Sequence, residues 1–202
     1  MSALVVGLTG PSGAGKSTVA ELFLRRGAHR IDCDGLARQA VDQLGVSRAL
    51  AARFGGDILV GGKLNRRLLA SRAFSSPAET EVLNEITHPA ILALLQNEID
   101  TAAASGARLI LVDAPTLFES GADRFCTAVI AVLAPAALRR ERIIARDDLT
   151  KQQADDRLAA SRPDSFYRER AAYVMTNTGD LDTLTLQADG IMEQIAQNNH
   201  AK

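Results

Sequence analysis

The chain has 202 residues, enough for one sizeable domain or for one domain with attached lobes. Its residues are 47 % apolar but only 4 % aromatic, with no Trp, so it can form a core but offers few base-stacking side chains. The net charge of −1 provides no basic field, so we expect neither nucleic acid nor a membrane as a partner.

The amino-terminal sequence and the cysteines favour a cytoplasmic protein. The apolar start at residues 3–8 has no basic stretch before it and is cut short by glycines, unlike a signal peptide. No apolar run is long enough to span a membrane. Cys33 and Cys126 lie far apart, in no metal-ligand spacing, and are expected to be reduced thiols. Nothing in the sequence indicates an oligomeric state.

Short apolar runs alternate with helical patterns along the chain. Strands are predicted at 3–8, 29–32, 108–113, 127–133 and 173–177. A helix is predicted from Lys16 to about Arg26, directly after the first strand. Strands that alternate with helices indicate an α/β fold, here with a five-stranded parallel sheet flanked by helices.

Two helical excursions leave this pattern. Residues 34–104 hold no strong strand candidate and predict a helical lobe, with a loop at 53–69 and a helix from Pro77 to about Ala104 that Pro89 interrupts. Residues 137–163 predict two further helices. Thr150 and Gln153 form a capping box for the second of them, and Pro163 ends it.

The segment Gly10–Ser17, called the phosphate loop below, matches the pattern G-x-x-x-x-G-K-[ST]. Its glycines let backbone N–H groups close around a phosphate, and the following helix adds free donors and a positive dipole end. Lys16, expected to be exposed in the ligand-free protein, would reach the outer phosphates, and Ser17 would offer its hydroxyl to Mg²⁺. The alternative is a tight turn without a ligand, but such a turn does not require Lys and Ser.

Polar residues lie at the carboxyl ends of several predicted strands. Ligands of open parallel sheets bind just outside these carboxyl ends. Asp113 ends the third strand, where it would orient Mg²⁺, or else cap the following turn. Asp32 and Asp34 follow the second strand, where one of them could accept a proton from an acceptor hydroxyl. Asp34 could instead be a helix N-cap, and the sequence leaves both roles open. Asn177 ends the fifth strand.

Arg139, Arg142 and Arg146 are spaced to share one helix face. Such a stripe is often only solvated, but a hinged lid that carries arginines to a phosphoryl group is the preferred interpretation here. His88, before Pro89, could be a substrate contact. On its own it is better explained as a surface residue.

Several of these segments together resemble dephospho-CoA kinases, over about residues 4–179. The resemblance is carried by "VGLTGPSGAGKSTV", "IDCDGLARQAV", "LNEITHPAI", "LVDAPTLFESG", "RRERIIARDDLTKQQADDRL" and "YVMTNTG". The phosphate loop is shared by many families. The combination of "DAPTLFE", "ITHP" and the D-x-D pattern of Asp32 and Asp34 is far more specific to this one family. This chain departs from the family pattern at Pro11, Ser161 and Ala172.

The resemblance implies a kinase that transfers the γ-phosphoryl group of ATP, with Mg²⁺, to the ribose 3′-hydroxyl of dephospho-CoA. The implied parts are a nucleotide-binding core (1–33, 105–138 and 164–202), a CoA-binding lobe (34–104) and a lid (139–163). The implied catalytic residues are Lys16, Asp34, Arg142 and Arg146, and the acceptor contacts are Asp32, Asp34 and His88. ATP contacts are expected from Ser12, Gly13, Ala14, Gly15, Lys16, Ser17, Thr18 and Asn177, and Mg²⁺ contacts from Ser17 and Asp113.

Two other functions fit the residues less well. One is another small-molecule kinase of the same architecture, acting on a nucleotide or on shikimate. The other is a nucleotide-dependent switch. The guanine-reading segment N-K-x-D of regulatory GTPases is missing, because its one candidate, "NTGD" at 177–180, lacks the lysine.

Overall fold

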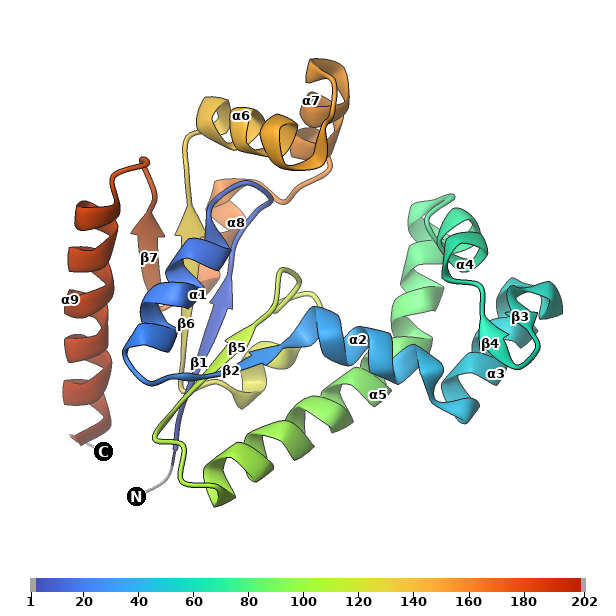
Figure 1. Cartoon of the computed structure of the whole chain (residues 1–202), viewed down its shortest axis with the longest axis horizontal. Helices are drawn as coiled ribbons and strands as arrows, with labels where there is room; N and C mark the ends of the chain where they lie inside the picture. The colour runs from blue at the N-terminus through green and yellow to red at the C-terminus, as the bar shows by residue number, and fades with distance from the viewer. Residues whose placement is uncertain (1–2, 201–202) are drawn as a thin grey trace. The chain divides into compact units, whose positions relative to one another are not determined.

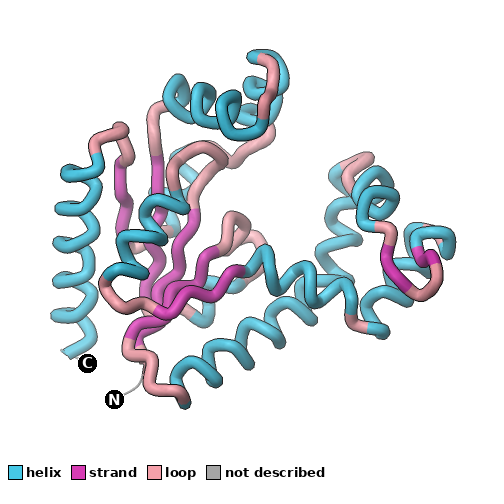
Figure 2. Tube along the Cα trace, in the orientation of Figure 1, coloured by secondary structure: helices cyan, strands magenta, loops and turns pink. Residues whose placement is uncertain are grey.

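A computed structural model describes residues 3–200 of the chain (Figures 1 and 2). One sheet holds the five expected strands, and each matches its predicted range to within one residue at either end. The strands are β1 (Leu4–Thr9), β2 (His29–Asp32), β5 (Leu109–Asp113), β6 (Ala128–Leu133) and β7 (Tyr173–Thr176). The predicted α/β class is thereby confirmed.

The sheet has the order β2-β5-β1-β6-β7, with β1 at its centre. β1 pairs in parallel with both β5 and β6, and β6 pairs in parallel with β7. The chain therefore passes from one side of β1 to the other between β5 and β6. A crevice outside the carboxyl ends of the strands is expected at such a switch point, and the phosphate loop follows β1 there.

Helices cover both faces of this sheet. On one face, α1 (Lys16–Arg25) and α9 (Leu181–His200) enclose the main core, in which Phe23, Leu8 and Met175 are fully buried. On the other face, Tyr167 of α8 (Asp164–Arg170) packs with Ala131 and Leu133 of β6. The short helix η2 (Ala122–Phe125) precedes β6. Alternate residues of the central strands thus face two separate apolar layers, as a doubly covered sheet requires.

Residues 32–101 form a second compact unit, distinct from the first unit of residues up to Ile31 and from Ala102 onward. Its elements are α2 (Cys33–Asp42), α3 (Leu44–Phe54), η1 (Gly56–Ile58), β3 (Leu59–Val60), β4 (Lys63–Leu64), α4 (Arg66–Ala73) and most of α5 (Pro77–Ala104). Leu50, Phe54, Ile58 and Leu69 form the centre of its own apolar core.

The predicted loop at 53–69 is wrong in detail, since it contains the antiparallel hairpin β3–β4. Gly61 and Gly62 make the two-residue turn, with φ of 58° and 77°, a conformation that glycine adopts without strain. Strands of two residues carry too little alternation to be recognised in the sequence.

The predicted break at Pro89 is also wrong, because α5 is continuous from Pro77 to Ala104. A proline inside a helix removes one backbone hydrogen bond and bends the helix without necessarily ending it. The ribbon of α5 changes direction along its length (Figure 1).

The excursion after β6 forms α6 (Ala136–Asp147) and α7 (Lys151–Ala159). The predicted capping box of Thr150 and Gln153 is confirmed. Pro163 does not end α7, which stops at Ala159. Instead it is the N-cap residue of α8. None of the helices formed by residues 3–200 is long and apolar enough to cross a membrane.

Candidate active site

The phosphate loop is shaped by its glycines and by a tight turn. The N–H of Ala14 donates to the carbonyl of Pro11 at 3.1 Å, so Pro11 is accommodated as the first residue of that turn. Gly13 has φ of 78°, and a Cβ there would lie 2.6 Å from the backbone oxygen of Arg139. Gly15 has φ of 92°, and a Cβ there would lie 2.0 Å from Nδ2 of Asn177. Larger residues at 13 and 15 would be strained and would also collide with their neighbours.

The amino-terminal end of α1 is open to an anion. Gly15 is its N-cap residue, so no side chain accepts the first N–H groups of this helix, and its first turn contains no acidic residue. Ser17 and Thr18 are exposed on that turn. Free N–H groups and the positive end of the helix dipole are what a phosphate needs.

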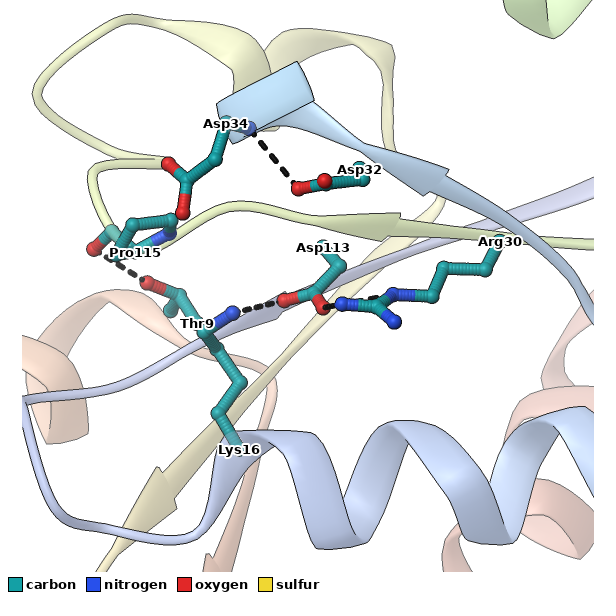
Figure 3. A network of polar contacts seen from close by, with 7 residues as sticks. All are labelled: Thr9, Lys16, Arg30, Asp32, Asp34, Asp113 and Pro115. Atoms are coloured by element: carbon teal, nitrogen blue, oxygen red, sulfur yellow. Dashed lines mark hydrogen bonds and ion pairs between the residues drawn. The ribbon is translucent and has the colours of Figure 1, made fainter. Parts of the chain in front are cut away.

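Lys16 and Asp113 form an ion pair across the end of the sheet (Figure 3). The Asp113 carboxylate is buried, with 1 % of its side chain exposed, and the Lys16 side chain is 19 % exposed. The expectation that Lys16 is exposed in the ligand-free protein is therefore wrong. A buried carboxylate needs a counter-ion, and the lysine at the start of α1 provides one.

Arg30 of β2 is a second counter-ion of Asp113, and no sequence motif indicated this role. Its Nε and Nη2 atoms donate to Oδ2 of Asp113 at 2.9 and 2.6 Å, while Lys16 donates to Oδ1 (Figure 3). The only signal in the sequence was a charged residue inside a short strand. Its significance depends on the position of β2 beside β5, which a local pattern does not contain.

Asn177 lies behind the phosphate loop and is 4 % exposed. Its Nδ2 donates to the carbonyl of Ala14 at 2.9 Å. Its Oδ1 accepts from Arg142 at 3.0 Å and from the N–H of Gly179 at 3.1 Å. The predicted nucleotide contact thus has its side-chain amide committed to hydrogen bonds within the protein.

The three spaced arginines do not act as one stripe. Arg142 lies against the phosphate loop, with Nη1 at 3.3 and 3.4 Å from the carbonyls of Gly13 and Ala14. Arg146 is exposed and makes two hydrogen bonds of 2.8 Å to Asp147, which raise the pKa of its guanidinium further. Of the three side chains, only that of Arg142 contacts the loop.

Arg139, the first residue of this group, is buried in α6. Its Nη1 lies 3.7 Å from a carboxylate oxygen of Asp164, beyond hydrogen-bond distance. The Arg139 side chain thereby pairs the start of α6 with the start of α8, whereas its backbone oxygen faces Gly13 of the phosphate loop.

Asp32 and Asp34 belong to the second unit and divide the roles that the sequence left open. Asp32, not Asp34, is the N-cap of α2, because its Oδ1 accepts the N–H of Asp34 at 3.1 Å (Figure 3). Asp32 also lies 3.6 Å from Arg38. Asp34 is an exposed residue of the first helical turn, so its carboxylate is not committed to capping.

His88 lies in the middle of α5 and is half-buried. Desolvation by burial lowers the pKa of its imidazole, which favours the neutral ring. A neutral ring can donate from one nitrogen and accept at the other, so His88 could hydrogen-bond an uncharged ligand group.

Ser17 and Asp113 suit the expected Mg²⁺ in kind. No group of three or more His, Cys, Asp or Glu side chains within residues 3–200 is placed to hold a metal ion. Mg²⁺ in phosphoryl-transfer sites takes one or two protein oxygens and completes its shell with phosphates and water. A hydroxyl and a carboxylate beside a phosphate loop are such a donor set.

Comparisons with known proteins agree with this geometry. The family model described as dephospho-CoA kinase matches residues 4–183. The dephospho-CoA kinase of Rhodopseudomonas palustris is 39 % identical over 194 residues, which cover 96 % of each chain. That of Deinococcus radiodurans is 41 % identical over 190 residues, covering 94 % of this chain and 91 % of the relative.

Solved structures show the same fold. A Thermus thermophilus protein is 32 % identical, with a TM-score of 0.81, over 96 % of this chain and 98 % of the other. A Campylobacter jejuni dephospho-CoA kinase has the same coverage, with 24 % identity and a TM-score of 0.70. An Acinetobacter baumannii shikimate kinase, at 19 % identity and a TM-score of 0.53 over 97 % and 94 %, shares the fold alone. Since both the family model and the relatives match over nearly the full length, the chain belongs to the dephospho-CoA kinase family.

Proposed function

We propose that this chain transfers the γ-phosphoryl group of ATP to the ribose 3′-hydroxyl of dephospho-CoA. The proposal rests on the phosphate loop, which contains Lys16 and is contacted by Arg142, in a chain that matches dephospho-CoA kinases over nearly its full length. Residues 1–33, 105–138 and 164–202 would bind the nucleotide, 34–104 the acceptor, and 139–163 would close as a lid.

Residues 12–18, in the phosphate loop and the first turn of α1, would hold the β- and γ-phosphates, mainly through their backbone N–H groups. Lys16 would exchange its bond to Asp113 for one to the phosphates, where negative charge must be stabilised in the transition state. Ser17 and Asp113 would hold Mg²⁺, which when bound neutralises charge on the phosphates. Arg142, already at the loop, would need only a local movement to contact the nucleotide. Arg146 would have to leave Asp147.

The acceptor oxygen would attack the γ-phosphorus as the bond to the β-phosphate oxygen breaks and ADP leaves. Asp34 would accept the 3′-hydroxyl proton, since its carboxylate is exposed and does not cap α2. Asp32 and His88 would contact the acceptor. We place the enzyme in the cytoplasm, in agreement with its cysteine content.

A coupled assay of ADP formation with dephospho-CoA, AMP, shikimate or water as acceptor tests this function. We expect turnover with dephospho-CoA to exceed that with each alternative. Equal or faster turnover with AMP or shikimate would contradict the proposed acceptor, and acceptor-independent hydrolysis would indicate a switch.

A further inference from the structure

One buried carboxylate, that of Asp113, is paired with two cations. Asp113 is 1 % exposed, and its neighbours Lys16 and Arg30 have side chains that are 19 % and 35 % exposed. The two cations take different oxygens, Lys16 at Oδ1 and Arg30 at Oδ2. Figure 3 shows the carboxylate between the two donors. The ion-pair group therefore carries one positive charge in excess.

We propose that Arg30 is a positioning residue for nucleotide binding, because it allows Lys16 to leave Asp113. The inference rests on the proposed function to the extent that Lys16 binds the phosphates of the nucleotide. It assigns a role to Arg30 that acts through Asp113 and Lys16, without contact between Arg30 and the nucleotide.

Two anions compete for Lys16. The single ammonium group of Lys16 has to serve a buried carboxylate before ATP binds and the phosphates afterwards. If it were the sole counter-ion, its departure would leave a buried charge unpaired, which is strongly unfavourable. That cost would be subtracted from the affinity for ATP.

Arg30 removes this cost. Its two hydrogen bonds to Oδ2 stay in place when Lys16 leaves Oδ1, so Asp113 keeps a charged partner throughout. The planar guanidinium also fixes the carboxylate, which leaves Oδ1 in a defined position for the next ligand. The excess positive charge in addition attracts the polyphosphate.

Two other roles of Arg30 predict different results. If Arg30 only ties β2 to β5, its removal lowers stability without a specific effect on nucleotide affinity. If it mainly competes with a cation for Asp113, its removal leaves metal-free binding unchanged and strengthens binding in the presence of Mg²⁺.

The experiment measures the affinity for ADP by calorimetry with EDTA present, so that neither the acceptor nor a metal takes part. We expect Arg30→Met to weaken ADP binding about tenfold, and Arg30→Lys, which keeps the charge, to recover most of this loss. The control is Arg26→Met, since Arg26 pairs with Asp189 away from the loop and should bind ADP as the unmodified protein does.

An Asp113→Asn background separates the proposed role from simple charge attraction. There the buried charge is absent, so adding Arg30→Met should weaken ADP binding much less than it does in the unmodified protein. An equal loss in both backgrounds, or unchanged or tighter binding by Arg30→Met alone, would overturn the proposal. Failure of dephospho-CoA as acceptor would instead contradict the proposed function and leave this binding result standing.

Discussion

The side-chain amide of Asn177 donates a hydrogen bond of 2.9 Å to the backbone carbonyl of Ala14. The end of the last sheet strand thus holds the phosphate loop from behind. The same amide accepts a hydrogen bond from Arg142 and fills the space that a side chain at Gly15 would need. These contacts favour a role for Asn177 in holding the phosphate loop over the direct ATP contact that the family resemblance implies.

The Asn177→Ala variant is therefore expected to bind ATP and GTP more weakly, by the same factor for both nucleotides. The loss of buried hydrogen bonds of this kind is on the order of 1–2 kcal/mol, or about tenfold in affinity. Measured kcat/KM values for both nucleotides check this. Gln187→Ala is the matched control. Gln187 exchanges two hydrogen bonds with the backbone of Thr176, the residue before Asn177, and makes no hydrogen bond to the loop. A larger loss of kcat/KM with ATP than with GTP would show that Asn177 contacts the nucleotide base.

Lys16→Ala is expected to abolish transfer while the fold is retained. Removing a cation from the developing charge lowers kcat by on the order of a hundredfold or more. Although the variant also removes one counter-ion of Asp113, Arg30 still pairs with that carboxylate, so the melting temperature should change little. Single-turnover assays at saturating ATP and a thermal melt test the two parts. Normal turnover would contradict the role of Lys16 in transfer.

Asp34 and Asp32 offer a matched pair of variants. Asp34→Asn should leave the melting temperature unchanged but lower kcat by roughly a hundredfold, the usual range for a positioned base. Asp32→Ala should destabilise the protein by about 1 kcal/mol, because it removes the N-cap of α2. Chemical denaturation and steady-state kinetics distinguish the two. A loose transition state needs little early proton removal, and near-normal kcat in Asp34→Asn would indicate that Asp34 positions the acceptor.

His88 should make stability depend on pH below neutrality. Burial lowers its pKa from the ordinary 6.5, so between the two pKa values the unfolded chain binds more protons than the folded protein. Stability from this group falls as pH drops below 6.5 and levels off below the folded pKa. His88→Gln should therefore gain stability relative to the unmodified protein as pH falls from about 7.5 to about 5. A stability difference that is constant with pH would contradict this.

The sequence by itself determined the class of fold and the position of the phosphate loop. Both depend on local chemistry, since a buried strand of a parallel sheet is apolar throughout and the loop needs glycine, lysine and a hydroxyl at fixed spacing. The capping box at Thr150 is equally local, and it was correct for the same reason. The helix from Pro77 to Ala104 was predicted with its observed bounds, but its interruption at Pro89 was not found, because one missing hydrogen bond does not outweigh the remaining contacts of a long helix.

The pairing of the site residues was decided only by the tertiary structure. Lys16, Arg30 and Asp113 meet because β5 lies between β1 and β2, an order that no local pattern specifies. The same holds for Asn177 and Ala14, which are 163 residues apart in the chain. The sequence left Asp34 as either a base or the N-cap, and only the observed start of α2 assigned the cap to Asp32 instead. Charge partners and burial are properties of three-dimensional neighbours, so residue type and spacing identified the candidates and the packing of the strands assigned their contacts.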